Sequence, residues 1–275
     1  DVAVVVLGLS QQLEGEEGQS EGNPEGVLSR SDRDSLDLPG EQEALLKAVA
    51  ATGTPVILVL LNGSALAVNW ADAHIPAILE AWYPGQAGGR AVAEALFGDT
   101  NPGGKLPITF YRSVEGLPPF EDYTMAGRTY RYFEGDVLYP FGFGLSYTQF
   151  SYQNLSINLD RLYSPKVLQV SCEVHNTGDI AGDEVVQVYL CHQQPAVPVP
   201  HHSLVGFKRV RLAPGAVEQV NFEITPRQYA IVTDQGQWAV DPGALRIFVG
   251  GGQPGFAQGI WATVEIHGGR AILAE

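Results

Sequence analysis

The sequence is poor in cysteine, and this limits the covalent chemistry available to the fold. Only Cys172 and Cys191 occur among the 275 residues, which excludes a disulfide framework and any recognisable zinc-ligand spacing. Both cysteines lie in apolar, strand-like stretches. We therefore expect two buried free thiols, with a single cross-strand disulfide as the alternative.

Basic residues and long apolar runs are also scarce. The 16 Lys and Arg side chains face 31 Asp and Glu side chains, which gives a net charge of −15. An acidic surface argues against a nucleic-acid partner or an anionic membrane, and it suits a protein that acts on a neutral ligand. No apolar run reaches the roughly 18 residues that a membrane span requires.

The N-terminus lacks an initiator Met and the pattern of a signal peptide. Its first residues, DVAVVVLG, already have the composition of a buried strand. We interpret the chain as a mature or cut piece of a longer protein, with a length that fits about two domains.

The first half of the chain alternates predicted strands with predicted helices. Apolar runs at 3–8, 56–63 and 77–85 indicate strands buried on both faces. Helices are expected at 39–53, where Leu45, Leu46 and Val49 form an apolar stripe, and at 88–98, which ends at Gly98. This alternation predicts a parallel sheet whose ligands bind beyond the carboxyl ends of the strands.

The second half changes to short, roughly alternating segments separated by Gly, Pro, Asn and Asp. This pattern predicts an antiparallel β-sandwich of about seven strands. The fold class is therefore α/β, with a mostly parallel sheet over residues 1–149, followed by an all-β sandwich over residues 150–275. The segments that carry the second prediction are VLQVSCEVHNTG, DEVVQVYLCH, VEQVNFEIT, WAVDPGALRIFVGGG and IWATVEIHG.

Several short motifs favour structural interpretations. GGGQPG at 250–255 satisfies G-x-G-x-x-G, but a strand follows it instead of a helix, so we expect a hairpin loop and no dinucleotide site. His201 and His202 lie in a Pro-rich stretch, where we expect a solvated loop. GRTYRYFEG at 127–135 predicts a packed strand with aromatic side chains on one face, and a carbohydrate or domain-interface surface is the alternative.

A long acidic stretch at 9–40 leaves the carboxyl end of the first predicted strand. Glycoside hydrolysis requires two carboxyl groups, one of which donates a proton and has a raised pKa. Glu14, Glu16 and Glu17 lie within four residues, so one of them could serve in a cleft. From composition alone a solvated acidic loop is the favoured interpretation, and the catalytic one stays open as the alternative.

Further stretches resemble glycoside hydrolase family 3 over nearly the whole chain. In that family a (β/α)8 barrel precedes an α/β sandwich domain, and many members add a fibronectin type III-like, immunoglobulin-like domain. The resemblance implies that this chain holds part of the second domain (1–149) and the third (150–275), without the barrel. The stretches are SDRDSLDLPGEQEALLKAV, VILVLLNGSAL, EAWYPGQAGGRAVAEALFGDTNPGGKLPITFY, GRTYRYFEGDVLYPFGFGLSYTQFSY, HNTGDIAGDEVVQVYL and LVGFKRVRLAPG.

The resemblance also implies a division of catalytic roles. Family members retain the anomeric configuration, with an aspartate nucleophile in the barrel and an acid/base glutamate in a loop of the second domain. The family's E-x-E-G pattern falls here on Glu16, with Glu14 as the second candidate and Glu17 as the third. The long insertion before Asp32-Arg33 departs from the shorter family loop.

The implied function is part of an exo-acting β-glycosidase that removes terminal β-D-glucosyl or β-D-xylosyl residues. The expected partners are an oligosaccharide or β-glycoside substrate and the barrel portion of the same enzyme, with a homo-oligomer left open. No cofactor or metal is implied, and a secreted or periplasmic location is expected, with a cytoplasmic one left open. The chain alone should be inactive. The alternatives are a non-catalytic carbohydrate-binding or scaffolding fragment, or a nucleotide-binding protein.

Overall fold

The computed structural model describes residues 1–14 and 33–273, and they form two units. Unit 1 comprises Asp1–Thr100, Thr109–Tyr123 and Glu134–Tyr139. Unit 2 comprises Asn101–Ile108, Thr124–Phe133 and Pro140–Glu275. Each unit has its own sheets. The domain boundary predicted at 149/150 rests on the change of sequence pattern and stays a prediction.

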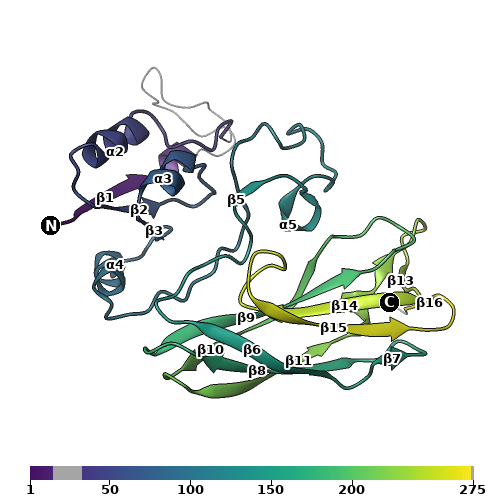
Figure 1. Cartoon of the computed structure of the whole chain (residues 1–275). Coiled ribbons are helices and arrows are strands. Elements are labelled where there is room, and N and C mark those ends of the chain that lie inside the picture. The colour runs from purple at the N-terminus through teal and green to yellow at the C-terminus, as the bar shows by residue number, and fades with distance from the viewer. Residues whose placement is uncertain (15–32, 274–275) are drawn as a thin grey trace. The chain divides into compact units, whose positions relative to one another are not determined.

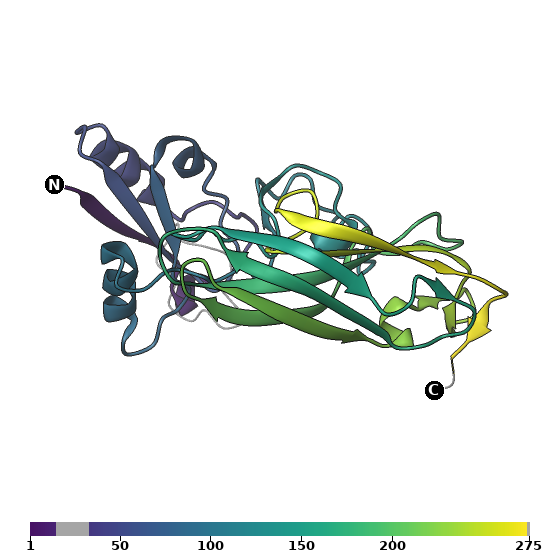
Figure 2. The same cartoon turned by 60° about the horizontal axis from the view of Figure 1, so that its bottom comes forward.

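Unit 1 is built on a parallel sheet in the order β1-β2-β3. Helices α2 and α4 lie on opposite sides of these strands in both views (Figures 1 and 2). A small antiparallel pair, β4-β5, completes the unit. The elements are β1 (Ala3–Gly8), α1 (Gln11–Glu14), α2 (Gln42–Ala50), β2 (Val56–Leu61), α3 (Asn69–His74), β3 (Ala77–Glu80), α4 (Gly88–Phe97), β4 (Phe110–Tyr111) and β5 (Val137–Tyr139).

The predicted strands and helices of unit 1 are present, but their burial differs from the expectation. Val4 and Val6 of β1 are 45% and 54% exposed, because they share one face of the strand and no described residue covers that face. In α2, Leu46 is fully buried while Leu45 is 54% exposed, so the apolar stripe is narrower than predicted. Helix α4 ends as expected at Gly98, whose φ of 80° is the left-handed conformation that glycine adopts readily.

Unit 2 is a β-sandwich with two main sheets, in the orders β10-β9-β14-β15-β7 and β11-β8-β6, and a small sheet β12-β13-β16. All pairs are antiparallel except β15-β7. Figure 2 shows the strands of the two main sheets as two layers. The elements are α5 (Thr129–Tyr132), β6 (Phe150–Ile157), β7 (Arg161–Leu162), β8 (Leu168–Asn176), β9 (Gly182–His192), β10 (Ser203–Leu212), β11 (Val217–Ile224), η1 (Pro226–Tyr229), β12 (Ile231–Val232), β13 (Trp238–Val240), β14 (Gly243–Gly250), β15 (Gly259–Ile266) and β16 (Ala271–Ile272).

The sandwich core follows from the alternating pattern of the strands. In β8, every second side chain from Leu168 to Val174 is buried, and these residues pack against the inward side chains of β9 and β14. Among the strands longer than two residues, the pattern did not single out β6 and β10, where β-bulges interrupt the alternation. It also missed β7, β12 and β16, which have two residues each. The remaining expected segments of this half form strands.

The structural interpretations of several motifs are confirmed. Residues 251–258 connect the antiparallel strands β14 and β15, so GGGQPG belongs to a hairpin loop. Cys172 and Cys191 are both buried and free. The stretch with His201 and His202 is a loop as expected, and His201 is exposed. His202 differs from the expectation, because it is only partly exposed and its Nδ1 lies 3.1 Å from the Cys191 sulfur.

GRTYRYFEG forms a single helical turn, α5, instead of the predicted strand. The ring of Tyr130 stacks on Phe141 with centroids 4.2 Å apart and meets Tyr189 edge-on at 6.1 Å. The Tyr130 hydroxyl also accepts a hydrogen bond from the backbone N–H of Leu204 at 3.1 Å. This stretch therefore packs onto the sandwich within unit 2.

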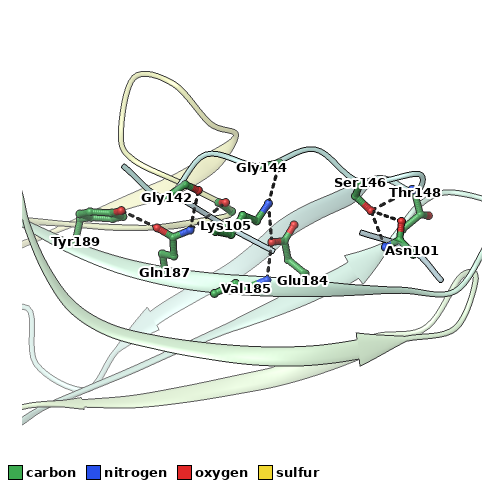
Figure 3. A network of polar contacts seen from close by, with 11 residues as sticks. Asn101, Lys105, Gly142, Gly144, Ser146, Thr148, Glu184, Val185, Gln187 and Tyr189 are labelled. Atoms are coloured by element: carbon green, nitrogen blue, oxygen red, sulfur yellow. Dashed lines mark hydrogen bonds and ion pairs between the residues drawn. The ribbon is translucent and has the colours of Figure 1, made fainter. Parts of the chain in front are cut away.

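A buried ion pair fastens two irregular segments of unit 2 onto β9 (Figure 3). Lys105 Nζ lies 3.3 Å from Glu184 Oε1, and the two side chains are 12% and 7% exposed. Lys105 also donates to the carbonyl of Gly144 at 2.8 Å, while Gln187 donates to the carbonyl of Gly142 at 3.1 Å. Burial raises the pKa of Glu184, and Lys105 partly opposes this effect.

Candidate active site

Polar side chains gather where the parallel strands of unit 1 end. β1 is followed by the short helix α1, which ends at Glu14, β2 is followed by Asn62-Gly63-Ser64, and β3 ends at Glu80. Because the carboxyl ends of parallel strands share one edge of the sheet, these side chains lie close together. This edge is the candidate active site, and we call it the carboxyl edge.

The end of β1 is fixed by Gly8 and by the side chain of Gln42 from α2. Gly8 has φ 135°, and a Cβ at this position would collide with the carbonyl of Leu61, so glycine is required. Gln42 accepts a hydrogen bond from the Gly8 N–H at 2.8 Å and donates to its carbonyl at 2.9 Å. The chain therefore leaves β1 in a defined direction toward Glu14.

The Glu14 carboxylate is the best-bonded group at the carboxyl edge. Its Oε1 accepts hydrogen bonds from the backbone N–H groups of Gly63 at 2.5 Å and Ser64 at 3.2 Å, and from the Tyr83 hydroxyl at 2.8 Å. Its Oε2 accepts a bond from the Ser64 hydroxyl at 2.5 Å. Four donors thus surround one carboxylate.

The balance of these contacts favours the ionised form of Glu14. Burial by itself raises the pKa of this carboxyl, but the hydrogen bonds from Ser64, Gly63 and Tyr83 together outweigh burial and leave the pKa below its ordinary value. The same contact and burial raise the pKa of the Tyr83 hydroxyl, which therefore remains a donor. Glu14 is an anion at neutral pH.

Arg33 supplies a positive charge at the same place. Its Nη1 donates to the Ser64 hydroxyl oxygen at 3.0 Å and to the Ala65 carbonyl at 3.3 Å, and its Nη2 donates to the Asp37 carbonyl at 3.2 Å. Burial lowers the pKa of Arg33, while the nearby Glu14 carboxylate opposes this shift. The guanidinium stays charged, as arginine does in proteins.

A second carboxyl, Glu80, lies in a very different environment at the same edge. It accepts hydrogen bonds from the Trp82 N–H at 3.0 Å and from Asn62 Nδ2 at 3.2 Å. These bonds only partly offset burial, which raises the pKa of Glu80 to about 7. Asn62 is itself completely buried, and within the described part of the chain its Oδ1 has no hydrogen-bond partner.

The turn after β3 carries local backbone strain. Trp82 has φ 54°, which is uncommon for a bulky residue, and its ring packs edge-on against Phe110 with centroids 6.0 Å apart. Strained backbone of this kind persists where the surroundings hold it, and it clusters at functional sites. The next residue, Tyr83, donates its hydroxyl hydrogen to Glu14 Oε1 at 2.8 Å.

Of the three predicted site residues, the structure describes one. Glu14 lies at the carboxyl edge, whereas Glu16 and Glu17 fall outside the described residues. Sequence reasoning missed Asn62, Ser64 and Glu80. Asn62 and Ser64 lie at or directly after the end of the predicted strand 56–63, so the rule that selected the acidic stretch after β1 would have found them. Glu80 falls inside the predicted strand 77–85, and only the observed end of β3 places it at the edge.

Two further features of the described residues concern metal binding and membrane spanning. Between residues 1–14 and 33–273, no three His, Cys, Asp or Glu side chains are placed to hold a metal ion. Over the same ranges, no helix combines the length and apolar character needed to cross a membrane.

Comparison with protein families decides the relationship. Residues 1–147, more than half of the chain, match the Glycosyl hydrolase family 3 C-terminal domain. The chain belongs to glycosyl hydrolase family 3. In this family 3 chain, residues 184–253 also match a Fibronectin type III-like domain. Both the predicted resemblance and the predicted fold class, an α/β domain followed by an all-β sandwich, are confirmed.

The family 3 chain is similar to parts of longer enzymes. It is 40% identical over 255 residues to a beta-xylosidase of Formosa agariphila, covering 91% of the chain and 34% of that protein. It is 36% identical over 262 residues to a periplasmic beta-glucosidase of Salmonella typhimurium, covering 91% of the chain and 32% of that protein. The chain thus spans about a third of the length of these relatives.

Solved structures give the same relationship. The b-glucosidase EmGH1 of Erythrobacter marinus is similar with a TM-score of 0.80 at 38% identity, over 97% of the family 3 chain and 34% of that protein. The beta-D-glucoside glucohydrolase of Trichoderma reesei is similar with a TM-score of 0.85 at 27% identity, over 97% of the chain and 40% of that protein. The fold therefore matches that of part of these enzymes.

Proposed function

We propose that this chain is part of a retaining, exo-acting β-glycosidase that removes terminal β-D-glucosyl or β-D-xylosyl residues. The observation that carries the proposal is the likeness of 91% of the chain to part of a beta-xylosidase and part of a beta-glucosidase. The carboxyl edge supports it further, because a carboxylate-rich segment begins there at Glu14. The substrate and the barrel partner belong to the same proposal.

Within this proposal Glu16 acts as the acid/base. Protonated Glu16 gives its proton to the glycosidic oxygen while an aspartate of the barrel attacks the anomeric carbon, so the glycosidic C–O bond breaks and a glycosyl-enzyme forms. Ionised Glu16 then removes a proton from water. The water oxygen attacks the anomeric carbon, which releases the sugar and restores the aspartate.

The assignment of Glu16 over Glu14 gains support from the contacts of Glu14. A general acid must hold a proton near neutral pH, which requires a raised pKa. The Glu14 carboxylate accepts hydrogen bonds from four donors, and its pKa is lowered. It is therefore a poor proton donor, and Glu17 is the remaining alternative.

The test uses the complete enzyme, in which this chain and a barrel are both present. Turnover of p-nitrophenyl β-D-xyloside and β-D-glucoside should be measured for the complete enzyme and for this chain alone, which we expect to be inactive. Glu16→Ala should slow substrates with poor leaving groups most, roughly 100-fold or more. Azide should restore turnover of activated aryl glycosides.

Each result has a distinct meaning. Absence of glycosidase activity in the complete enzyme would overturn the proposal and favour the carbohydrate-binding or scaffolding alternative. Azide rescue of Glu17→Ala in place of Glu16→Ala would move the acid/base by one residue. We also propose a secreted or periplasmic location, which cell fractionation with antibodies against this chain would test.

A further inference from the structure

The two ends of the segment 15–32 are tied to one side chain. Ser64 donates its hydroxyl hydrogen to Glu14 Oε2 at 2.5 Å, and its oxygen accepts a hydrogen bond from Arg33 Nη1 at 3.0 Å. Glu14 and Arg33 are the residues that immediately flank this segment. Contacts from both flanks therefore converge on the first turn after β2.

We infer that Glu14, Ser64 and Arg33 form a clasp at the carboxyl edge, in which Glu14 positions the acid/base glutamate and does not transfer the proton itself. The inference rests on the proposed function, because it concerns the glutamate that the same segment would contribute. Glu14 is thus a positioning residue. Its role is to fix the point from which the chain departs toward Glu16.

The contacts explain why a carboxylate suits this task. The backbone N–H groups of Gly63 and Ser64 both point at Glu14 Oε1, an arrangement that binds anions. Both N–H groups lose this hydrogen bond if position 14 offers no acceptor. Hydrogen bonds to an ionised acceptor are roughly twice as strong as neutral ones. A neutral side chain at position 14 would hold the turn more weakly.

Position and charge both extend the effect along the chain. Two residues of extended chain span at most about 7 Å, so a fixed Glu14 restricts the reach of Glu16. An ionised carboxylate also disfavours ionisation of a nearby carboxyl, so the negative charge of Glu14 favours the protonated form of Glu16. The clasp therefore supports the acid step in two separable ways.

Glycine at position 63 makes the approach possible. A Cβ at this position would lie 2.8 Å from the Tyr83 ring and 3.2 Å from Glu14 Oε1. The Tyr83 hydroxyl donates the fourth bond to Glu14 at 2.8 Å. The turn after β2, the turn after β3 and the helix α1 thus meet around a single carboxylate.

The decisive variant is Glu14→Gln in the complete enzyme. We expect kcat to fall roughly 10- to 100-fold for an alkyl β-glycoside and only a few-fold for an activated aryl glycoside, because proton donation matters less for a good leaving group. Azide should not restore activity, since the acid/base carboxylate is still present. The alkaline limb of the pH–rate profile should move to lower pH, because the neighbouring negative charge is gone.

Three further variants complete the experiment. Ser64→Ala should shift the ratio of alkyl to aryl turnover in the same direction, and the double variant should lose less than the sum of the single losses, as expected for contacting groups. Glu43→Gln is the matched control, because Glu43 lies in the same unit and forms an exposed ion pair with Lys47 at 2.5 Å. We expect this control to change neither the ratio of alkyl to aryl turnover nor the pH–rate profile.

The outcomes separate this inference from the proposed function. Azide rescue of Glu14→Gln would make Glu14 the acid/base and overturn the clasp, while leaving the glycosidase standing. Equal losses of kcat on the alkyl and the aryl glycoside, with an unchanged pH–rate profile, would mean that Glu14 has only a structural role. That result would also overturn the inference. Should Glu14→Gln not fold, Tyr83→Phe removes one donor only and must still shift the substrate ratio.

Discussion

The carboxyl edge of unit 1 and the ion pair of unit 2 both hold a carboxylate, but they treat it in opposite ways. Glu14 is half-buried and receives four hydrogen bonds, so its pKa is lowered. Glu184 is 5% exposed, lies beside Lys105, and has a raised pKa because burial dominates. The number and geometry of donors, and not the presence of a charged partner alone, decide which form of the carboxyl is favoured.

Glu14 is therefore suited to remain ionised in a functional site, whereas Glu184 is suited to stabilise the fold through its ion pair. A buried ion pair has lost hydration on both partners, so removal of either partner is strongly destabilising. A carboxylate in a cradle of N–H and O–H donors can remain ionised close to solvent. We therefore expect replacement of Lys105 to act on the stability of unit 2 and replacement of Glu14 to act on turnover.

Lys105→Met should have the largest effect on stability. It leaves Glu184 buried without its cation and removes the hydrogen bond to Gly144. Loss of one partner of a buried pair costs about 3–5 kcal/mol in the free energy of unfolding. The cost should shrink at low pH, where Glu184 becomes protonated. Hydrogen exchange of the β9 and β14 amides reports this loss for unit 2.

Lys208→Met is the control for that substitution. Lys208 Nζ lies 3.2 Å from Glu218 Oε1, but the two side chains are 46% and 38% exposed. Exposed pairs contribute roughly 0–1 kcal/mol. Equal losses for the two lysine variants would mean that burial is not what distinguishes the Lys105–Glu184 pair.

Glu80→Gln should have a smaller effect that depends on pH. The ordinary pKa of 4.5 is raised to about 7 in the folded protein, so the folded state binds this proton more tightly than the unfolded state. The resulting stability is complete below about pH 4.5 and is lost as the pH rises through about 7. Glutamine resembles the protonated form and does not ionise. The variant should therefore exceed the parent in stability at pH 8 by about 2–3 kcal/mol.

The comparison is made at each pH separately, by urea denaturation with hydrogen exchange into the β2 amides as the readout. At pH 4 the variant and the parent should differ little. Glu94→Gln serves as the control, because Glu94 forms an exposed pair with Arg90 at 2.6 Å. A Glu80→Gln variant that is less stable than the parent at pH 8 would show that the hydrogen bonds from Asn62 and Trp82 outweigh burial.

Much of the fold could be predicted because periodicity carries it. The apolar runs at β1 and β2 and the alternating pattern of β8 each occur within one continuous stretch of sequence. Burial was harder to predict, since the exposure of Val4 and Leu45 depends on which neighbours cover each face. The α5 turn was mistaken for a strand because its aromatic side chains satisfy contacts that lie far away in sequence, as with Tyr130 and Leu204.

The site was predictable only in part, for the same reason. The acidic stretch after β1 was found because its composition is local and the family pattern singles out Glu16. The contact between Glu14 and Ser64 joins residues 50 positions apart, and no local pattern encodes it. A rule that treats the ends of all parallel strands together would have brought Ser64 to attention, but not Glu80, because β3 ends five residues before the predicted strand does.

Gly63→Ala tests the cradle itself and should have the smallest effect of the three. The new Cβ would lie 2.8 Å from the Tyr83 ring, which must shift, but Tyr83 is 47% exposed and can move. We therefore expect a loss of only about 1 kcal/mol in the stability of unit 1, at the lower limit for overpacking. Gly89→Ala in α4 is the matched control, because no atom lies within 4 Å of its added Cβ. It should be neutral or stabilising by up to about 1 kcal/mol, since alanine favours helix.

Equal stabilities of the two alanine variants would contradict the cradle. The packing of Tyr83 and Glu14 around Gly63 would then be too loose to fix the carboxylate. Hydrogen exchange of the Gly63 and Ser64 amides would in that case be fast in the parent as well.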